Sequence, residues 1–156
     1  MKTIVILLLF LLLSYGAFGQ RVIDTVYKYE WVVDSMGEAN DCSVRAHAEV
    51  FGLTYRQAHA DLKRAGRHNR KGIDVLNYIN YLNTNKTGYS IELSLAKDST
   101  TNKSFIREVA ETGSSYLMIA KDHIYAIQEY KGKWAIKGNH NERLTKPIAW
   151  LKIDRI

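Results

Sequence analysis

The sequence is poor in cysteine, since Cys42 is the only one among its 156 residues. A single thiol excludes an internal disulfide framework. The histidines never recur three or four residues apart, and the acidic residues form no cluster at ligand spacing, so we expect neither a metal site nor a cofactor. Cys42 is therefore expected to be buried and inert, paired with another chain, or chemically active.

Long apolar runs are also scarce. The longest is IVILLLFLLL, residues 4–13, and its ten residues fall short of the about 20 that a bilayer-spanning helix needs. Lys2 precedes the run, and small residues follow it, with Ala17 and Gly19 at the usual cleavage positions. These features predict a secretory signal peptide over residues 1–19, with a retained membrane anchor as the alternative.

The chain after the predicted signal has the size of one domain. Removal of residues 1–19 leaves 137 residues (156 − 19), which is enough for one domain with a core and too few for two. We therefore expect a single domain over residues 20–156. It is expected to be secreted or periplasmic, with no membrane span once the signal is cleaved.

Acidic residues are the minority among the charged residues. The chain has 22 Lys and Arg against 16 Asp and Glu, a formal net charge of +6. Much of the positive charge lies in KRAGRHNRKG, residues 63–72, which predicts a solvated basic loop or a contact with an anionic partner such as an envelope polymer. Aromatic residues are not interleaved with this run and no nucleic-acid-binding motif occurs, so we expect no nucleic-acid partner.

Apolar periodicity and breaker residues predict helices early in the domain and strands late. Helices are expected over residues 42–51, 55–65 and 73–82, with one more over 102–112. Strands are expected over residues 26–33, 89–95, 114–120, 123–130, 133–138 and 148–153. This order predicts an α+β fold, in which an N-terminal helical cluster packs on a C-terminal antiparallel sheet.

Cap residues set the expected helix limits. Asn40 and Asp41 are both good N-cap residues for the first helix, and Gly52 is suited to end it. Thr54 and Gln57 have the spacing of a capping box for the second helix.

The third helix and the last strand carry two further expectations. Val75, Leu76, Ile79 and Leu82 are predicted to form the buried stripe of the third helix. The single proline, Pro147, is expected to begin the last strand, where a missing N–H matters least.

The segment Asn40-Asp41-Cys42 places the only thiol at the start of a helix. Unpaired N–H groups and the positive dipole end of a helix lower a thiol pKa, and a nearby imidazolium does the same. Of the five histidines, His123 is the best candidate because it opens the alternating run HIYAI. It would therefore stand at the leading end of a core strand and reach a cleft.

A catalytic imidazole needs a partner that orients its second ring nitrogen. Asn139 lies 16 residues after His123 (139 − 123), a spacing that returns the end of one hairpin strand to the start of the other. His140 is the alternative third polar residue. The segment KGNHN is equally suited to a simple turn.

The run NDCSVRAHAEVFGLTYRQAHADLKRAGRHNRKGI, residues 40–73, resembles the N-terminal half of small bacterial and phage papain-like cysteine peptidases, which are related to bacteriocin leader peptidases. The shared features are Asn-Asp-Cys, a following Arg-Ala, a short helix ended by glycine, a second helix led by tyrosine, and a Gly-Arg and Arg-Lys-Gly loop. HIYAI, followed by a further strand, resembles the strand that carries their histidine.

This resemblance implies a papain-like fold and an exported cysteine hydrolase that cleaves a peptide or amide bond through a thioester. Cys42 would be the nucleophile, His123 the general base, and Asn139 the residue that orients it. Asn40 would help the Cys42 backbone N–H to hold the oxyanion. The implied partner is a peptide or protein substrate.

Two other functions fit the same residues. A cell-wall amidase of the NlpC type also has a cysteine at a helix start and a histidine that leads a strand. A catalytically inactive papain-like scaffold would instead hold a partner through its tyrosine-rich surface and the basic loop, residues 63–72.

Overall fold

Helices and strands fall in the chain order predicted from the sequence. The structure, a computed structural model, describes residues 23–24, 40–137 and 146–156. The predicted strand over residues 26–33, the signal over residues 1–19, and Asn139 and His140 lie outside these residues. The elements are β1 (Ile23–Asp24), α3 (Cys42–Phe51), α4 (Tyr55–Arg64), α5 (Val75–Asn85), β2 (Tyr89–Leu95), α6 (Asn102–Glu108), β3 (Ser115–Ala120), β4 (His123–Tyr130), β5 (Lys133–Lys137) and β6 (Pro147–Arg155).

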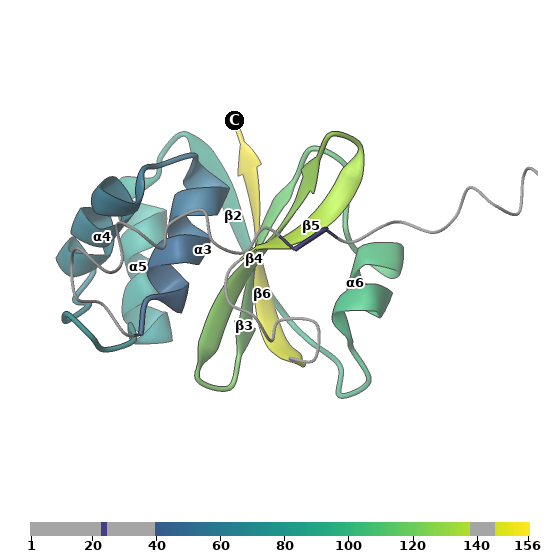
Figure 1. Ribbon diagram of the computed structural model, residues 1–156, viewed down its shortest axis with the longest axis horizontal. Helices are drawn as coiled ribbons and strands as arrows, with labels where there is room; N and C mark the ends of the chain where they lie inside the picture. Colours follow the sequence, from purple (N-terminus) through teal and green to yellow (C-terminus); the bar gives the residue numbers. More distant parts are fainter. Residues whose placement is uncertain (1–22, 25–39, 138–145) are drawn as a thin grey trace, which may run out of the picture.

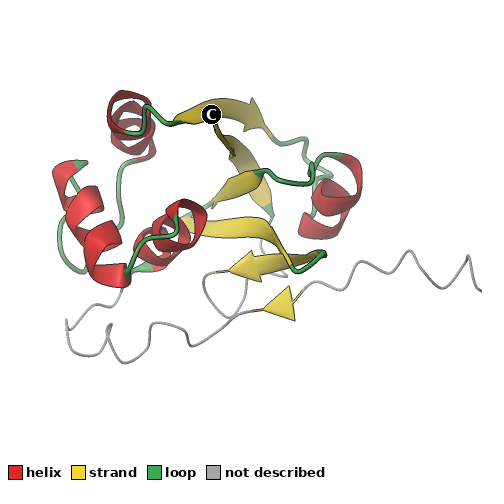
Figure 2. Cartoon of the chain, turned by 90° about the horizontal axis from the view of Figure 1, so that it is seen from above, coloured by secondary structure: helices red, strands yellow, loops and turns green. Residues whose placement is uncertain are grey.

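One sheet lies between two unequal layers of helices, so the described fold is α+β, as predicted. The strand order is β1-β5-β4-β3-β6-β2, with β1 parallel to β5 and all other neighbours antiparallel. Helices α3, α4 and α5 cover one face, and α6 lies on the other (Figure 1). The view from above shows the same separation (Figure 2). No helix in the described ranges is long and apolar enough to cross a membrane.

The predicted turn chemistry sets the ends of the helices. Helix α3 begins at Cys42 and ends before Gly52, whose φ of 63° is left-handed and therefore suits glycine. Thr54 and Gln57 form the predicted capping box of α4, because each side chain bonds the backbone N–H of the other residue. Both helices therefore start at the predicted residues.

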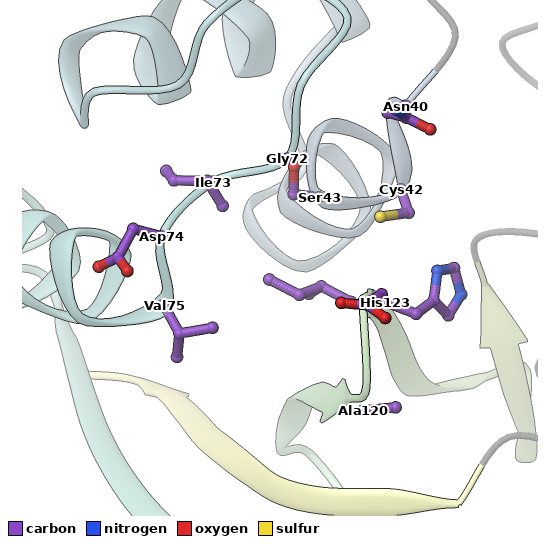
Figure 3. A pocket seen from close by; sticks show the side chains of 11 residues that line it. Asn40, Cys42, Ser43, Gly72, Ile73, Asp74, Val75, Ala120 and His123 are labelled. Atoms are coloured by element: carbon purple, nitrogen blue, oxygen red, sulfur yellow. The ribbon is translucent and has the colours of Figure 1, made fainter.

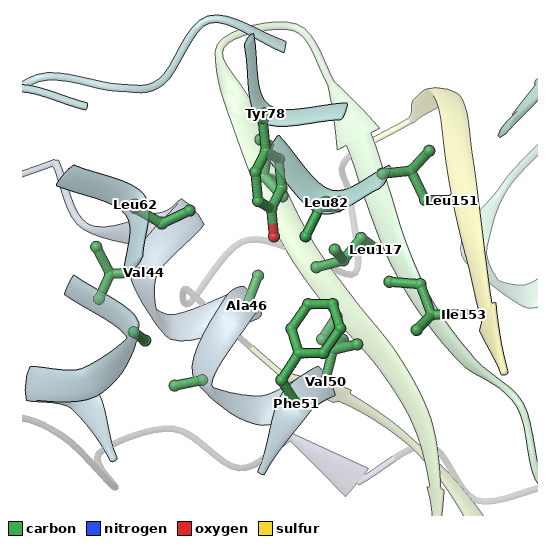
Figure 4. Close-up of a cluster of buried hydrophobic side chains, with 14 of the residues drawn as sticks. Val44, Ala46, Val50, Phe51, Leu62, Tyr78, Leu82, Leu117, Leu151 and Ile153 are labelled. Carbon is green, nitrogen blue, oxygen red and sulfur yellow. The ribbon is translucent and has the colours of Figure 1, made fainter. Parts of the chain in front are cut away.

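The strand alternation of β4 divides the core into two clusters. Ile124 and Ala126 pack with the helices α3 to α5, whereas Tyr125 and Ile127 pack with α6 and its neighbours. Figure 4 shows the larger cluster, in which side chains of α3 share one core with Leu117 of β3 and with Leu151 and Ile153 of β6. Strand β4 is thus buried on both faces, and its first residue, His123, is held at the end of a rigid central strand.

The predicted stripe of α5 is wrong at one position. Leu76 is 71 % exposed, whereas Tyr78 and Leu82 are fully buried, and Val75 is partly buried against the same cluster. Val75, Tyr78 and Leu82 are separated by three and four residues, so they share one helix face that Leu76 does not. Tyr78 thus takes the place expected for Leu76.

A buried polar network joins helices α3, α4 and α5. His47 is fully buried; its Nδ1 lies 2.9 Å from the Tyr78 hydroxyl and its Nε2 lies 3.3 Å from Asp61 Oδ2. Lys86 Nζ donates to the same carboxylate oxygen at 2.7 Å. Burial, chiefly, lowers the pKa of His47 to about 4, so the imidazole is neutral at neutral pH.

This buried imidazole should make the fold sensitive to mild acid. In the unfolded chain a histidine has a pKa of about 6.5, so only the unfolded state gains a proton as the pH falls towards the folded pKa of about 4. The free energy of unfolding should drop by about 3 kcal/mol across that window. Urea denaturation at a series of pH values should show the slope in the natural chain and a much flatter profile for His47→Gln. The exposed His68→Gln serves as the control, and parallel profiles for the two variants would contradict the prediction.

Candidate active site

A pocket of about 480 Å³ opens where the start of α3 meets the start of β4. Three segments line it: Asn40, Cys42 and Ser43 around the start of α3, residues 72–75 before and at the start of α5, and Ala120 with residues 122–124 at the β3–β4 connection. Cys42 and His123 are both among the lining residues. Figure 3 shows Cys42 and His123 on one side of the pocket and the segment 73–75 on the other. The structure thus brings together the two residues that the sequence singled out.

Cys42 is the first residue of α3 and is half-buried. Asp41 occupies the N-cap position, but within the described chain no side chain caps the helix. The Asp41 carboxylate instead accepts from Arg45 Nε at 2.7 Å and from the Tyr55 hydroxyl at 3.2 Å. The Asp41 side chain thus does not take the usual capping bond from the N–H groups of the first turn.

Burial, the largest effect, raises the pKa of the Cys42 thiol above its ordinary value. Hydrogen bonds from the backbone N–H groups of Ile124 and Ser43 act in the opposite direction, as does the positive charge of Arg67. The start of the helix therefore favours the thiolate, as the sequence predicted. The sequence predicted a thiol that is ionised overall, but in this conformation the pKa of Cys42 is raised. Removal of the sulfur from water has a larger effect on the pKa than the N–H groups have.

His123 begins β4, as predicted, and is partly exposed at the pocket. Its ring stacks on Tyr125, with centroids 5.5 Å apart and an interplanar angle of 20°, because residues two apart in a strand share a face. Burial lowers the pKa of His123, which favours the neutral imidazole that a general base requires.

The main chain brings the two residues close together. The Ile124 N–H acts to lower the pKa of the Cys42 thiol, and this nitrogen is part of the peptide unit that follows His123. The start of α3 and the start of β4 therefore meet at the pocket that both residues line.

Asn40 lines the pocket, but its amide has another partner in this structure. Asn40 Nδ2 donates to the Arg70 carbonyl at 3.1 Å, and the Asn40 carbonyl accepts from an Arg67 guanidinium nitrogen at 2.8 Å. Asn40 therefore joins the start of α3 to the basic loop rather than capping the helix.

The candidates for the third polar residue, Asn139 and His140, fall outside the described residues. The strand that precedes them, β5, runs antiparallel to β4, and its last residue, Lys137, pairs with Ala126. That pairing is three residues from His123 (126 − 123).

The basic run also contains a residue that the sequence interpretation placed wrongly. Arg67 is only 3 % exposed, whereas a solvated basic loop over residues 63–72 would place every residue of the run in solvent. Ser43, which lines the pocket, was not singled out; it is 1 % exposed and its hydroxyl has no hydrogen-bond partner among the described residues. Gly66 predicts where α4 ends, but it does not predict that the side chain of Arg67 is buried. No sequence signal marked Ser43.

A metal centre finds no support in the described residues. No group of three or more His, Cys, Asp and Glu side chains there is placed to hold a metal ion.

The buried Ser43 hydroxyl leads to a stability prediction. A buried hydroxyl without a partner destabilises the folded state by about 1 to 3 kcal/mol, so Ser43→Ala should leave the free energy of unfolding unchanged or raise it. Ser104→Ala is the matched control, because the Ser104 hydroxyl accepts from the Thr101 N–H in the capping box of α6 and its loss should destabilise the fold by about 0.5 to 1 kcal/mol. Equal losses for both variants in urea denaturation would show that the Ser43 hydroxyl has a partner.

The candidate site is thus defined by its own geometry: an uncapped helix start that presents Cys42, and a strand that presents His123, in one open pocket. Comparison of the chain with protein-family models, with curated proteins and with solved structures finds no match in any of the three.

Proposed function

We propose that the protein is an exported, papain-like thiol hydrolase that cleaves an amide bond, with Cys42 as nucleophile and His123 as general base. The observation that carries this proposal is the pocket that Cys42, at the start of α3, and His123, at the start of β4, both line. It brings the only thiol of the chain and an imidazole to one cavity. The peptide nature of the substrate, the papain-like fold and export come from the resemblance and from the signal-like residues 1–19.

The proposed reaction has two halves. First, the Cys42 proton passes to the neutral His123 imidazole, the sulfur bonds to the carbonyl carbon, and the carbon–nitrogen bond breaks as the leaving amine takes the proton from His123. Then a water molecule gives a proton to His123 while its oxygen bonds to the thioester carbon. The carbon–sulfur bond breaks and the sulfur regains the proton, so one amide and one water yield an acid and an amine.

The first half requires a conformational step at His123. In the described conformation the ring stacks on Tyr125, and burial holds the pKa of the Cys42 thiol above its ordinary value. Turning the ring towards the sulfur would replace that stacking with a hydrogen bond to the thiol. The resulting thiolate and imidazolium would stabilise each other.

The start of α3 is the proposed site of the oxyanion. The Cys42 backbone N–H belongs to a helix start without a side-chain cap, so a negatively charged oxygen would be favoured there. In this proposal Asn40 adds its amide only after leaving the Arg70 carbonyl that it now contacts. Asn139 remains the proposed residue that orients His123, on the resemblance alone.

A papain-like binding protein without catalytic activity is the second candidate. It is favoured by the raised pKa of Cys42 and by the engagement of the Asn40 amide with the loop. Under this function the pocket would hold a ligand without attacking it, and the basic loop, residues 63–72, would contact an anionic partner such as an envelope polymer.

Alkylation of the single cysteine with iodoacetamide separates the two functions. If His123 activates the thiol, Cys42 should react rapidly at mildly acidic pH, and His123→Ala should slow the reaction by about tenfold or more. His68→Ala, at an exposed position, should react like the natural chain. A thiol that titrates only above its ordinary pKa of about 8.5, with no effect of His123→Ala, would favour the binding protein.

Hydrolysis assays then address the substrate class. A peptide library and cell-wall peptide fragments should be tested with the natural chain, His123→Ala and Cys42→Ala. Under the proposal, hydrolysis should fall by about 100-fold or more in both variants, and mass spectrometry should detect an acyl group on Cys42. Cleavage of the cell-wall fragments alone would indicate the NlpC-type amidase instead of the peptidase.

A further inference from the structure

The end of α4 fixes the backbone of Arg67 next to the candidate site. Gly66 has a φ of 93°, its N–H donates to the Lys63 carbonyl at 3.1 Å, and the Arg67 N–H donates to the Leu62 carbonyl at 2.9 Å. These two bonds form a Schellman motif, in which glycine takes the left-handed position and the following residue closes the last turn. Arg67 therefore leaves the helix in one set direction.

The side chain of Arg67 turns inward from that point. It is 3 % exposed, and its guanidinium donates to the Asn40 carbonyl at 2.8 Å, two residues ahead of Cys42. Asn40 returns a bond to the same loop through the Arg70 carbonyl at 3.1 Å. Two hydrogen bonds thus join Asn40, just ahead of Cys42, to the loop. The donor of one of them is the buried, positively charged guanidinium of Arg67.

We propose that Arg67 is a positioning residue of the thiol site: its buried guanidinium fixes the segment that precedes Cys42 and stabilises the ionised sulfur. This inference rests on the proposed thiol chemistry. Arginine suits the role because it keeps its charge at every relevant pH, and a charge removed from water acts over a longer distance than an exposed one. The neighbouring basic residues Arg70 and Lys71 are exposed, so solvent screens their charges.

Other charged groups near Cys42 also act on the pKa of its thiol. The negative charge of Asp41 acts to raise the pKa of the thiol, and the positive charge of Arg67 acts in the opposite direction with a smaller effect. The Asp41 carboxylate is itself paired with Arg45. The remaining titratable groups that line the pocket are Asp74, Asp122 and His123.

The test is the pH dependence of Cys42 alkylation by iodoacetamide, a neutral reagent, in the full chain. The variants are Arg67→Gln, which removes the charge but keeps a donor for the Asn40 carbonyl, and Arg67→Lys, which keeps the charge. Lys71→Met removes a charge from an exposed position of the same loop and serves as the matched control. Arg67→Gln should raise the midpoint of the alkylation profile above the midpoints of the other two variants. Arg67→Lys should stay close to the natural chain, and Lys71→Met should be unchanged.

The Gln and Lys variants together make the outcome decisive. Because both remove the forked guanidinium, a purely structural role for Arg67 would shift their midpoints equally, and equal midpoints would overturn the proposal. An Arg67→Gln midpoint equal to that of Lys71→Met would also overturn it. The readout does not depend on turnover: a midpoint raised only in Arg67→Gln, in a chain that hydrolyses nothing, would leave the role of Arg67 in place while the hydrolase proposal fails.

Discussion

The packing of α3 against β4 sets the position of every group in the candidate site. The helix contributes a buried apolar face, and β4 contributes Ile124 and Ala126, which join the same cluster. At the other end of the helix, Lys137 Nζ bonds Glu49 Oε2 at 2.7 Å, and both side chains are largely buried. With α3 fixed at both ends, Cys42 lies at the pocket that His123 also lines, and the candidate site follows from this packing of helix on strand.

Two opposing effects act on the thiol at that contact. Apolar packing places α3 firmly on the sheet, but the same packing withdraws the sulfur from water and raises the pKa of the thiol. Backbone N–H groups and the Arg67 charge act against this effect. In the proposed reaction His123 completes the activation, and its ring, which stacks on Tyr125 in the described conformation, would have to turn towards the sulfur.

Much of this arrangement could be predicted from the sequence where a local rule governs it. Helix α3 has the predicted limits because Gly52 ends it, and the convergence of Cys42 and His123 follows from a helix start and a strand start that meet at one pocket. The two-residue period of the strand places residues 123 and 125 on one face, which is consistent with the stacking of the His123 ring on Tyr125. The burial of Arg67 could not be predicted, because a helix-ending glycine sets where the chain turns and not what the next side chain meets. Leu76 is apolar but exposed, because its angle around the helix places it off the face that Val75, Tyr78 and Leu82 share.

The loop that contains Arg67 and Arg70 continues directly into Gly72 and Ile73, which form a wall of the pocket. The loop thus touches both whatever occupies the pocket and the peptide segment ahead of the nucleophile. If a ligand displaces this wall on binding and thereby moves Asn40, linkage requires that a change at Asn40 alters the affinity for that ligand by the same factor.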